Sequence, residues 1–156
     1  MNYPEIVLRK GKEQSLERLH PWVFSGAVAR QPDNIEEGDT VKVVSSTGNV
    51  IGTGHYQIGS ITVRILAWGD SPVDAALYSE RLKAAYQLRR ALKLINRHNN
   101  AYRLVHGEGD FLPGLVVDVY GDTAVLQAHS PGMHFARDII ASELVNLPDA
   151  GIKNIY

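Results

Sequence analysis

Apolar and polar residues alternate with a period of two over much of residues 1–70, which is the pattern of half-buried strands. The clearest runs are 40–45 (TVKVVS) and 61–68 (ITVRILAW), and shorter apolar runs occupy 5–10, 22–28 and 50–56. Turn-forming residues separate these runs, and 13–19 could form one or two helical turns. Five short strands with one small helix predict a small β-barrel or half-barrel, in which closure protects the strand edges.

The pattern changes after Gly69-Asp70-Ser71-Pro72, which we take as a domain boundary. A helix capped by Asp74 or Ser79 is predicted next, with apolar residues recurring at steps of three and four. That apolar stripe comprises Leu82, Ala85, Leu88, Leu92 and Ile95. A strand at 101–105, a hairpin turning at 121–123 and a helix at 134–146 follow. The predicted fold class is therefore α+β: a small barrel over 1–70, then a small α/β domain over 71–156 with a hairpin and two helices.

The last residues, 151–156 (GIKNIY), have the pattern of a strand that begins after a turn. An apolar strand with no partner is a poor place for a natural protein to end. We therefore expect the sequence to be a piece of a longer protein, with the second domain truncated at its C-terminal end. A natural edge strand is the alternative.

Composition adds two constraints. The chain has no cysteine, which excludes disulfides, thiolate metal sites and cysteine nucleophiles. With no signal peptide and no apolar run of membrane-spanning length, we expect a soluble, cytoplasmic protein without a membrane partner. The net charge is only −1, but residues 1–30 carry five basic and three acidic residues, and residues 79–100 carry six basic and one acidic. Phosphate binding requires such a local positive face, not a positive total.

The densest cluster of candidate binding residues lies around the first glycine turn. Lys10 and Lys12 flank Gly11, and a short helix then carries Arg18 toward His20. Such a surface could grip a phosphate backbone. We name these four residues as candidate RNA contacts, with Arg30 and Arg64 as weaker ones. The nearby aromatics Trp22 and Phe24 are predicted to pack in the core.

A second polar cluster, His106-Gly107-Glu108-Gly109-Asp110, offers one histidine and two carboxylates. Metal sites need three or four converging ligands, and no further ligand can be named from sequence. We therefore interpret this loop as a brace for the hairpin, and we interpret Asp118 as an acid that faces solvent or caps a neighbour. No catalytic, cofactor-binding or metal-binding residue is assigned.

Two long motifs resemble one known family. The run from Lys10-Gly11 through HPWVFSGAV (20–28) resembles the N-terminal PUA domain of bacterial large-subunit ribosomal RNA cytosine-C5 methyltransferases. The segment YRLVHGEGDFLPGLVVDVYGDTAVLQ (102–127) resembles the central domain of the same family. The resemblance extends from about Val7 to Tyr156, and the two motifs occur in the family's order.

The resemblance implies three parts: a PUA RNA-binding domain, a central α/β domain and a C-terminal domain that binds S-adenosylmethionine. Only the first two are expected here, so ribosomal RNA and the missing methyltransferase domain are the implied partners, and a homodimer is possible. A cytosine-C5 methyltransferase needs a cysteine nucleophile, which this chain lacks. Neither glycine cluster fits a nucleotide-binding turn, because Gly52-Thr53-Gly54 lies in a strand and Gly107–Asp110 precedes a hairpin. We expect no cofactor and no methyl transfer in this piece alone.

The main hypothesis is thus an RNA-binding, substrate-positioning fragment of such a methyltransferase. One alternative is a scaffold that docks the catalytic domain, or forms a dimer, without touching RNA. Another is a different PUA-bearing RNA-modifying enzyme, of a pseudouridine-forming or archaeosine type.

Overall fold

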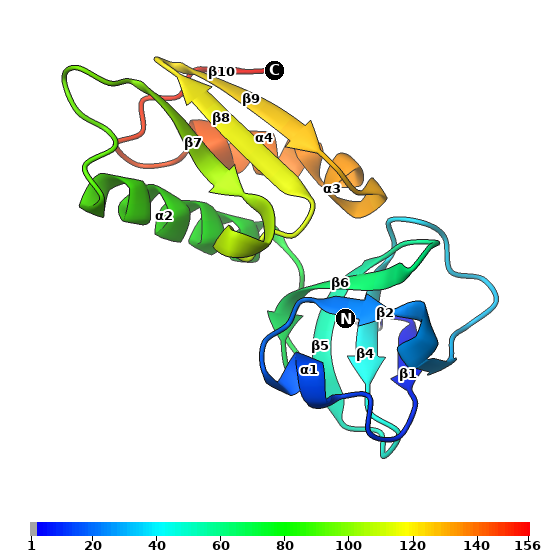
Figure 1. Ribbon diagram of the computed structural model, residues 1–156. Helices are drawn as coiled ribbons and strands as arrows, with labels where there is room; N and C mark the ends of the chain where they lie inside the picture. Colours follow the sequence, from blue (N-terminus) through cyan, green and yellow to red (C-terminus); the bar gives the residue numbers. More distant parts are fainter. Residues whose placement is uncertain (1–2) are drawn as a thin grey trace. The chain divides into compact units, whose positions relative to one another are not determined.

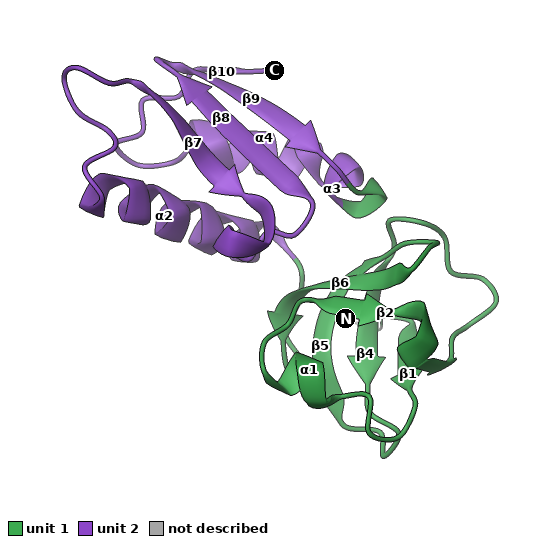
Figure 2. Cartoon of the chain, in the orientation of Figure 1, with its two compact units in different colours: residues 1–73, 130–132 green, residues 74–129, 133–156 purple. Residues whose placement is uncertain are grey.

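The computed structural model describes residues 3–156, which form two compact units (Figures 1 and 2). The first comprises residues up to Val73 together with Ser130–Gly132, and the second comprises Asp74–His129 and Met133–Tyr156. The strands form two sheets with both parallel and antiparallel pairs, and the helices are separate from these sheets. The α+β class predicted from sequence is therefore confirmed.

The first unit is built on one curled sheet in the order β2-β6-β5-β4-β1-β3. Its elements are β1 (Glu5–Leu8), α1 (Gln14–Glu17), β2 (Trp22–Phe24), β3 (Val28–Arg30), β4 (Thr40–Val44), β5 (Val50–Tyr56) and β6 (Ile61–Trp68). Strands β1 and β4 pair in parallel, and the other pairs of neighbouring strands are antiparallel.

The run 22–28, predicted as one strand, is two strands separated by the 3₁₀ turn Ser25–Ala27. The prediction of a single strand was therefore wrong. Strand β2 pairs with β6 and β3 pairs with β1, so the two consecutive strands lie at opposite ends of the sheet order. Three residues can span only about 10 Å. The two ends of the sheet are therefore held close together, which curls it into a half-barrel.

The core of this unit is made of alternate residues from the curled strands, completed by one residue of α1. Its fully or nearly fully buried members are Ile6, Leu8, Leu16, Val23, Val41, Val43, Tyr56, Val63 and Ile65. The alternation seen in the sequence of β4 and β6 thus corresponds to the two faces of the sheet.

Strand β5 requires glycine where it bends against β6. The pairing register shifts between Thr53 and Gly54, which marks a β-bulge. A Cβ atom at Gly54 would lie 2.0 Å from the backbone oxygen of Arg64. Since that oxygen belongs to the neighbouring strand, it cannot move aside without breaking the sheet.

We predict that Gly54→Ala lowers the free energy of unfolding by about 3 kcal/mol or more, as in overpacked cores. Gly26→Ala is the matched control, because no atom lies within 4 Å of a Cβ there; its effect should stay within about 0.5 kcal/mol. Urea denaturation followed by circular dichroism measures both. Equal effects from the two substitutions would show that β5 and β6 do not approach each other this closely.

His55 is a buried titratable group of the same strand, with a relative exposure of 6%. Burial lowers the pKa of His55 from 6.5 to about 4, because the charged imidazolium is poorly solvated there. Gly132, one of the three residues that join this unit from later in the chain, leaves no room for a side chain: a Cβ would lie 2.2 Å from Cγ of His55.

Acid should therefore destabilise the first unit through His55. The unfolded chain binds a proton near pH 6.5 and the folded chain does so only near pH 4, so stability is lost as pH falls from 6.5 toward 4. Between pH 7 and pH 5 the loss from this group should be about 2 kcal/mol. Urea denaturation at both pH values, compared between the wild-type chain and His55→Gln, isolates the contribution. A difference between the two proteins that stays constant with pH would contradict it.

The second unit is a four-stranded sheet in the order β10-β9-β8-β7 with helices against it (Figure 1). Its elements are α2 (Ala75–Ala91), β7 (Ala101–His106), the 3₁₀ turn η2 (Gly107–Asp110), β8 (Leu115–Tyr120), β9 (Thr123–Ala128), α4 (Arg137–Val145) and β10 (Asn154–Ile155), together with α3 (Pro131–Phe135) from Met133 onward. The hairpin β8–β9 was predicted, and the strand predicted at 151–156 is the short β10, which pairs in parallel with β9.

Helix α2 begins where the sequence indicates but turns a different face inward. The side chain of Asp74 caps it by accepting a hydrogen bond from the amide of Leu77 at 3.1 Å. The buried residues are Tyr78, Leu82, Ala85, Tyr86 and Arg89. Of the apolar stripe identified in the sequence, Leu82 and Ala85 are buried, whereas Leu88 and Leu92 are 48% and 60% exposed. Arg89 occupies the inward position instead.

The helix predicted at 134–146 is two helices, α3 and α4, which meet at Ala136. Among the apolar residues of this segment, Ile140 and Leu144 are buried, whereas Phe135 and Ile139 are 64% and 44% exposed. Met133 supplies buried apolar surface in α3 that the sequence pattern did not identify. Within residues 3–156, no helix is both long enough and apolar enough to cross a bilayer.

Candidate nucleic-acid interface

The segment from Arg9 to His20 carries four of the six candidate contact residues. Strand β1 ends at Leu8, and the chain then turns at Gly11, whose φ of +79° favours glycine. The amide of Lys12 donates to the carbonyl of Arg9 at 3.0 Å, which closes this turn. Lys10 and Lys12 are therefore displayed on one short, hydrogen-bonded loop, and both are exposed.

Helix α1 and the residues after it present the other two candidates. Leu16 anchors the helix because its side chain is 1% exposed and its carbonyl accepts a hydrogen bond from Nε1 of Trp68 at 3.2 Å. Arg18 and His20 follow, and both are exposed. The amide of His20 donates to the carbonyl of Ser15 at 3.0 Å, so the chain folds back over the helix end.

Residues 9–20 are called the basic segment below. Its capacity to bind an anion depends on which of its cations are already paired with carboxylates. Among the residues that the structure describes, no carboxylate forms an ion pair with Lys10, Lys12 or Arg18. Arg9 uses Nε to donate to the carbonyl of Val28 at 3.1 Å, which fastens the segment to β3. The three unpaired cations remain available to an anion from solution.

The two weaker candidates lie elsewhere. Arg30 is exposed at the end of β3 and pairs in register with Val7, three residues before Lys10. Arg64 lies on β6, half-buried, and its guanidinium donates to the side-chain oxygen of Gln57. The structure thus gathers Lys10, Lys12, Arg18 and His20 on one segment, and places Arg30 and Arg64 on separate strands.

Exposed aromatic rings adjoin the basic segment, and the sequence analysis missed them. The rings of His20 and Trp22 meet edge to face with centroids 5.6 Å apart, and Phe24 lies 6.2 Å from each. Phe24 is 48% exposed and Trp22 is half-buried, so the prediction that both pack in the core was wrong. Val23 takes the core position, and the period of two therefore turns its neighbours outward. The alternation of β2 could have predicted this, because residues on either side of a buried Val23 point away from the core.

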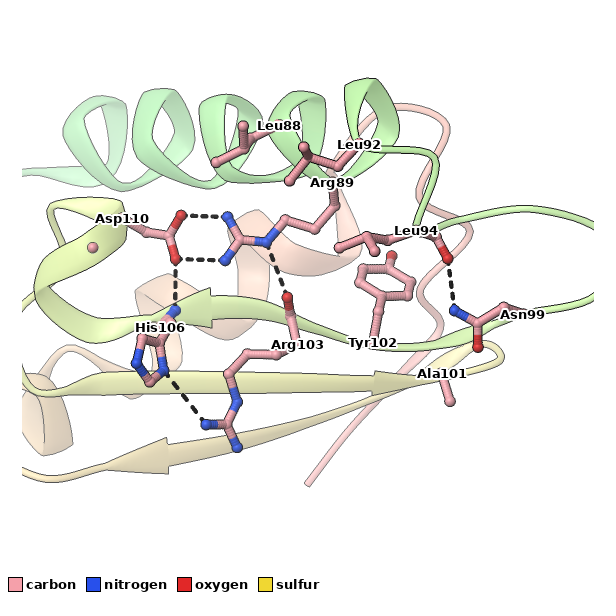
Figure 3. Close-up of a pocket in the computed structure, with 11 residues that line it drawn as sticks. Leu88, Arg89, Leu92, Leu94, Asn99, Ala101, Tyr102, Arg103, His106 and Asp110 are labelled. Carbon is pink, nitrogen blue, oxygen red and sulfur yellow. Dashed lines mark hydrogen bonds and ion pairs between the residues drawn. The ribbon is translucent and has the colours of Figure 1, made fainter.

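In the second unit, Arg89 has a structural partner that removes it from the basic surface. Its guanidinium forms two hydrogen bonds with the carboxylate of Asp110, one of them 2.8 Å long, and its Nε donates to the carbonyl of Arg103 at 3.0 Å (Figure 3). Asp110 also accepts from the amide of His106 at 2.6 Å. The loop 106–110 is thereby fastened to helix α2, whereas the sequence was interpreted as a brace for the hairpin. Within residues 3–156 no group of acidic and histidine side chains has the arrangement of a metal site.

Asp118 also forms an ion pair with an arginine. It accepts two hydrogen bonds from the guanidinium of Arg103, at 2.8 and 3.0 Å, across the β7–β8 pair. Arg103 lowers the pKa of Asp118 and Asp118 raises that of Arg103, so both remain charged. The interpretation of Asp118 as an acid that caps a neighbour agrees with this pair.

Breaking the buried pair should be costly. Arg89→Met leaves the carboxylate of Asp110 buried without its partner, and we predict a loss of about 3–5 kcal/mol in unfolding free energy. Arg90→Met, one residue along, removes an exposed pair with Asp149 at 3.6 Å and should cost about 1 kcal/mol or less. Urea denaturation of both variants provides the comparison. Similar losses would mean that the Arg89–Asp110 pair does not secure the loop.

Comparison with known proteins now defines the class of the first unit. Residues 6–68 match the family model of the PUA-like domain. The chain therefore contains a PUA-like domain, and that unit is the curled half-barrel that carries the basic segment.

The whole chain is similar to longer methyltransferases. It is 39% identical over 154 residues to the ribosomal RNA large subunit methyltransferase I of Klebsiella pneumoniae, a match that covers 96% of this chain and 38% of that protein. The protein of the same name from Erwinia tasmaniensis is 40% identical over 151 residues, which are 94% of this chain and 38% of the relative. The chain thus spans somewhat over a third of the length of these relatives. These matches confirm the resemblance to large-subunit ribosomal RNA methyltransferases that was drawn from the sequence.

Solved structures support the same fold. A Streptococcus mutans protein described as a SAM-dependent methyltransferase superposes with a TM-score of 0.78 at 17% identity. The match covers 97% of this chain and 40% of that protein. Both units of the present chain therefore occur together, in this order, in the larger structure.

Proposed function

We propose that this chain is the RNA-binding and substrate-positioning part of a ribosomal RNA methyltransferase. The observation that carries the proposal is the basic segment of the PUA-like domain, where Lys10, Lys12 and Arg18 have no carboxylate partner among the described residues. Unpaired cations suit contacts to phosphates, which position an RNA without reading its sequence. His20 adds a ring and a hydrogen-bonding nitrogen beside them.

The relatives give the proposal its substrate class. They are named as methyltransferases of large-subunit ribosomal RNA, so the RNA held here would be part of that molecule. The finer assignment to cytosine C5 rests on the motifs at 20–28 and 102–127. That chemistry requires a cysteine nucleophile, and the chain contains none. Bond formation would accordingly belong to residues outside this sequence.

The residues present do not fit S-adenosylmethionine. Gly52 and Gly54 lie inside β5, where a Cβ would collide with backbone atoms of β6, so they form no open turn. Gly107 and Gly109 lie in a 3₁₀ turn followed by β8, and not ahead of a helix that could receive a phosphate or carboxylate. In the proposed whole enzyme the cofactor would bind to the catalytic domain, which is also the chain's second proposed partner.

Charge reversal tests the proposal. We predict that the triple variant Lys10→Glu/Lys12→Glu/Arg18→Glu binds a large-subunit ribosomal RNA transcript at least about tenfold more weakly than the wild type in filter binding, because three phosphate contacts become repulsive. The control reverses three exposed cations of the second unit, Lys83, Arg137 and Lys153, and so changes the net charge equally. Its affinity should fall much less.

Unchanged affinity in the triple variant would contradict the proposal. It would favour the alternative, in which the two units dock the catalytic domain or a second copy without touching RNA. Equal losses in the triple variant and its control would also contradict it, because the binding would then follow net charge and not this segment.

A further inference from the structure

Three aromatic rings on and before strand β2 lie together on the surface of the PUA-like domain. The rings of His20, Trp22 and Phe24 have centroids 5.6 or 6.2 Å apart. Val23 fills the core between them, so Trp22 and Phe24 share the outer side of the strand. Phe24 is 48% exposed, and His20 is exposed as well. Aromatic rings that gather at one exposed place indicate a surface that binds a partner. These three rings are called the aromatic face below.

The rings of the aromatic face hold one another in place. Trp22 meets both His20 and Phe24 edge to face, with interplanar angles of 87°. Nδ1 of His20 also accepts a hydrogen bond from the amide of Trp22 at 3.2 Å. The neutral imidazole therefore carries its proton on Nε2, which can donate to an oxygen of a base or phosphate. A platform ordered in this way loses little entropy when a flat group stacks on it.

Leu19, directly before His20, is an independent sign of a binding role. Its φ is 62°, in the left-handed region, and its side chain is 55% exposed. Its amide donates to the carbonyl of Leu16 at 2.9 Å, and the amide of His20 donates to that of Ser15 at 3.0 Å, which is the pair of bonds that ends a helix with a left-handed residue. Glycine is usual there, because a Cβ atom makes this backbone costly. Leucine thus combines backbone strain with exposed apolar surface, which a ligand contact explains and stability does not.

The aromatic face and the basic segment belong to one closed loop. At one end, Arg18 lies two residues before His20, a Cα separation of at most about 7 Å. At the other end, Arg9 donates from its amide to the carbonyl of Ala27 at 2.8 Å and from Nε to that of Val28 at 3.1 Å, just beyond Phe24 and the 3₁₀ turn. The cations therefore lie on the outgoing half of this loop, residues 9–28, and the rings lie on its returning half.

The charges of this loop and its neighbours favour an anionic partner. Residues 9–28 contain four basic and two acidic residues. Among the described residues, neither Glu13 nor Glu17 forms an ion pair with a cation. Strand β6, which pairs with β2, carries Arg64 and no acid. The carboxylate of Glu37, which reaches the turn between β5 and β6, accepts from the amide of Ile58 at 2.9 Å. The matching ligand thus combines a flat ring with negative charge, as a nucleotide of RNA does.

We propose that the aromatic face binds an unpaired base of the RNA, which stacks on Phe24, with Leu19 as a further apolar contact and the cations of the basic segment on the flanking phosphates. The inference rests on the proposed function, because it takes RNA as the partner, and it names the part of the RNA that is recognised. A base inside a duplex is covered on both sides by its neighbours and cannot stack on a protein ring. The site therefore selects a single-stranded loop, bulge or end.

The first test separates base stacking from phosphate binding. Fluorescence anisotropy would compare the whole 156-residue chain on an oligouridylate of about 12 nucleotides and on an abasic ribose-phosphate strand with the same number of phosphates. Phe24→Leu keeps an apolar side chain but removes the ring, so it should bind the oligouridylate about tenfold more weakly. Its affinity for the abasic strand should stay within about twofold of wild type. Phe135→Leu is the matched control, because Phe135 is 64% exposed beside a histidine ring in α3, and both of its affinities should be unchanged.

A second test uses the strain at Leu19. Leu19→Gly relieves the left-handed backbone, so the midpoint of urea denaturation should stay constant or rise, while the affinity for the oligouridylate should fall at least about threefold. Phe111→Gly is the control, since Phe111 has a φ of 57° and is 44% exposed in the second unit; its affinity for the oligouridylate should not change. A lower midpoint with unchanged affinity in Leu19→Gly would make Leu19 a structural residue and overturn its assignment.

A third measurement locates the base directly. An oligouridylate that carries one 4-thiouridine should form a photo-crosslink to the tryptic peptide 19–30, which contains all three rings. A crosslink only to peptides of the second unit would overturn the inference.

The outcomes separate this inference from the proposed function. If Phe24→Leu binds the oligouridylate normally while the triple variant of the basic segment binds ribosomal RNA weakly, the inference fails and the proposed function stands. If Phe24→Leu weakens binding of the oligouridylate and of the abasic strand equally, the ring does not act through a base and the inference is overturned. It is also overturned if Phe24→Leu changes only self-association in sedimentation, because the aromatic face is then a protein interface.

Discussion

The pairing of cations with carboxylates determines which parts of this molecule are structural and which can bind an anion. Arg89 and Arg103 are held by Asp110 and Asp118, and they secure a loop and a strand pair. Lys10, Lys12 and Arg18 have no such partner among residues 3–156. The net charge of −1 does not reveal this difference, because it does not show which cations are paired with acidic residues and which are not. Binding to a polyanion depends on local charge, and local charge depends on this pairing.

The fold supports that division. Three residues between β2 and β3 join the two ends of the curled sheet, and α1 is anchored on it by Leu16. The basic segment therefore sits on a rigid half-barrel and not on a free loop, which reduces the entropy lost when RNA binds. In the second unit the pair of Arg89 and Asp110 fastens turn η2 to helix α2. The proposed contacts of the basic segment thus have a preorganised frame.

Much of this arrangement could be predicted from local sequence pattern. Alternation identified β4 and β6, and Asp74, one of the two candidate caps, identified the start of α2. What could not be predicted depends on contacts between distant residues. Arg89 enters the core because a carboxylate 21 residues later receives it, and Leu88 and Leu92 turn outward in consequence. Likewise, the split of 22–28 follows from a change of partner strand. The roles of Lys10, Lys12, Arg18, His20, Arg30 and Arg64 stay predictions.

The salt dependence of RNA binding tests the central claim most directly, since each phosphate contact releases counterions when RNA binds. The measurement is the slope of log K against log salt concentration for the wild-type chain and for a variant in which Lys10, Lys12 and Arg18 are replaced by glutamine. If these cations contact phosphates, the slope should become shallower by about 2, or about 0.7 for each cation on single-stranded RNA. An identical slope in the two proteins would show that the unpaired cations of the basic segment face water and not RNA.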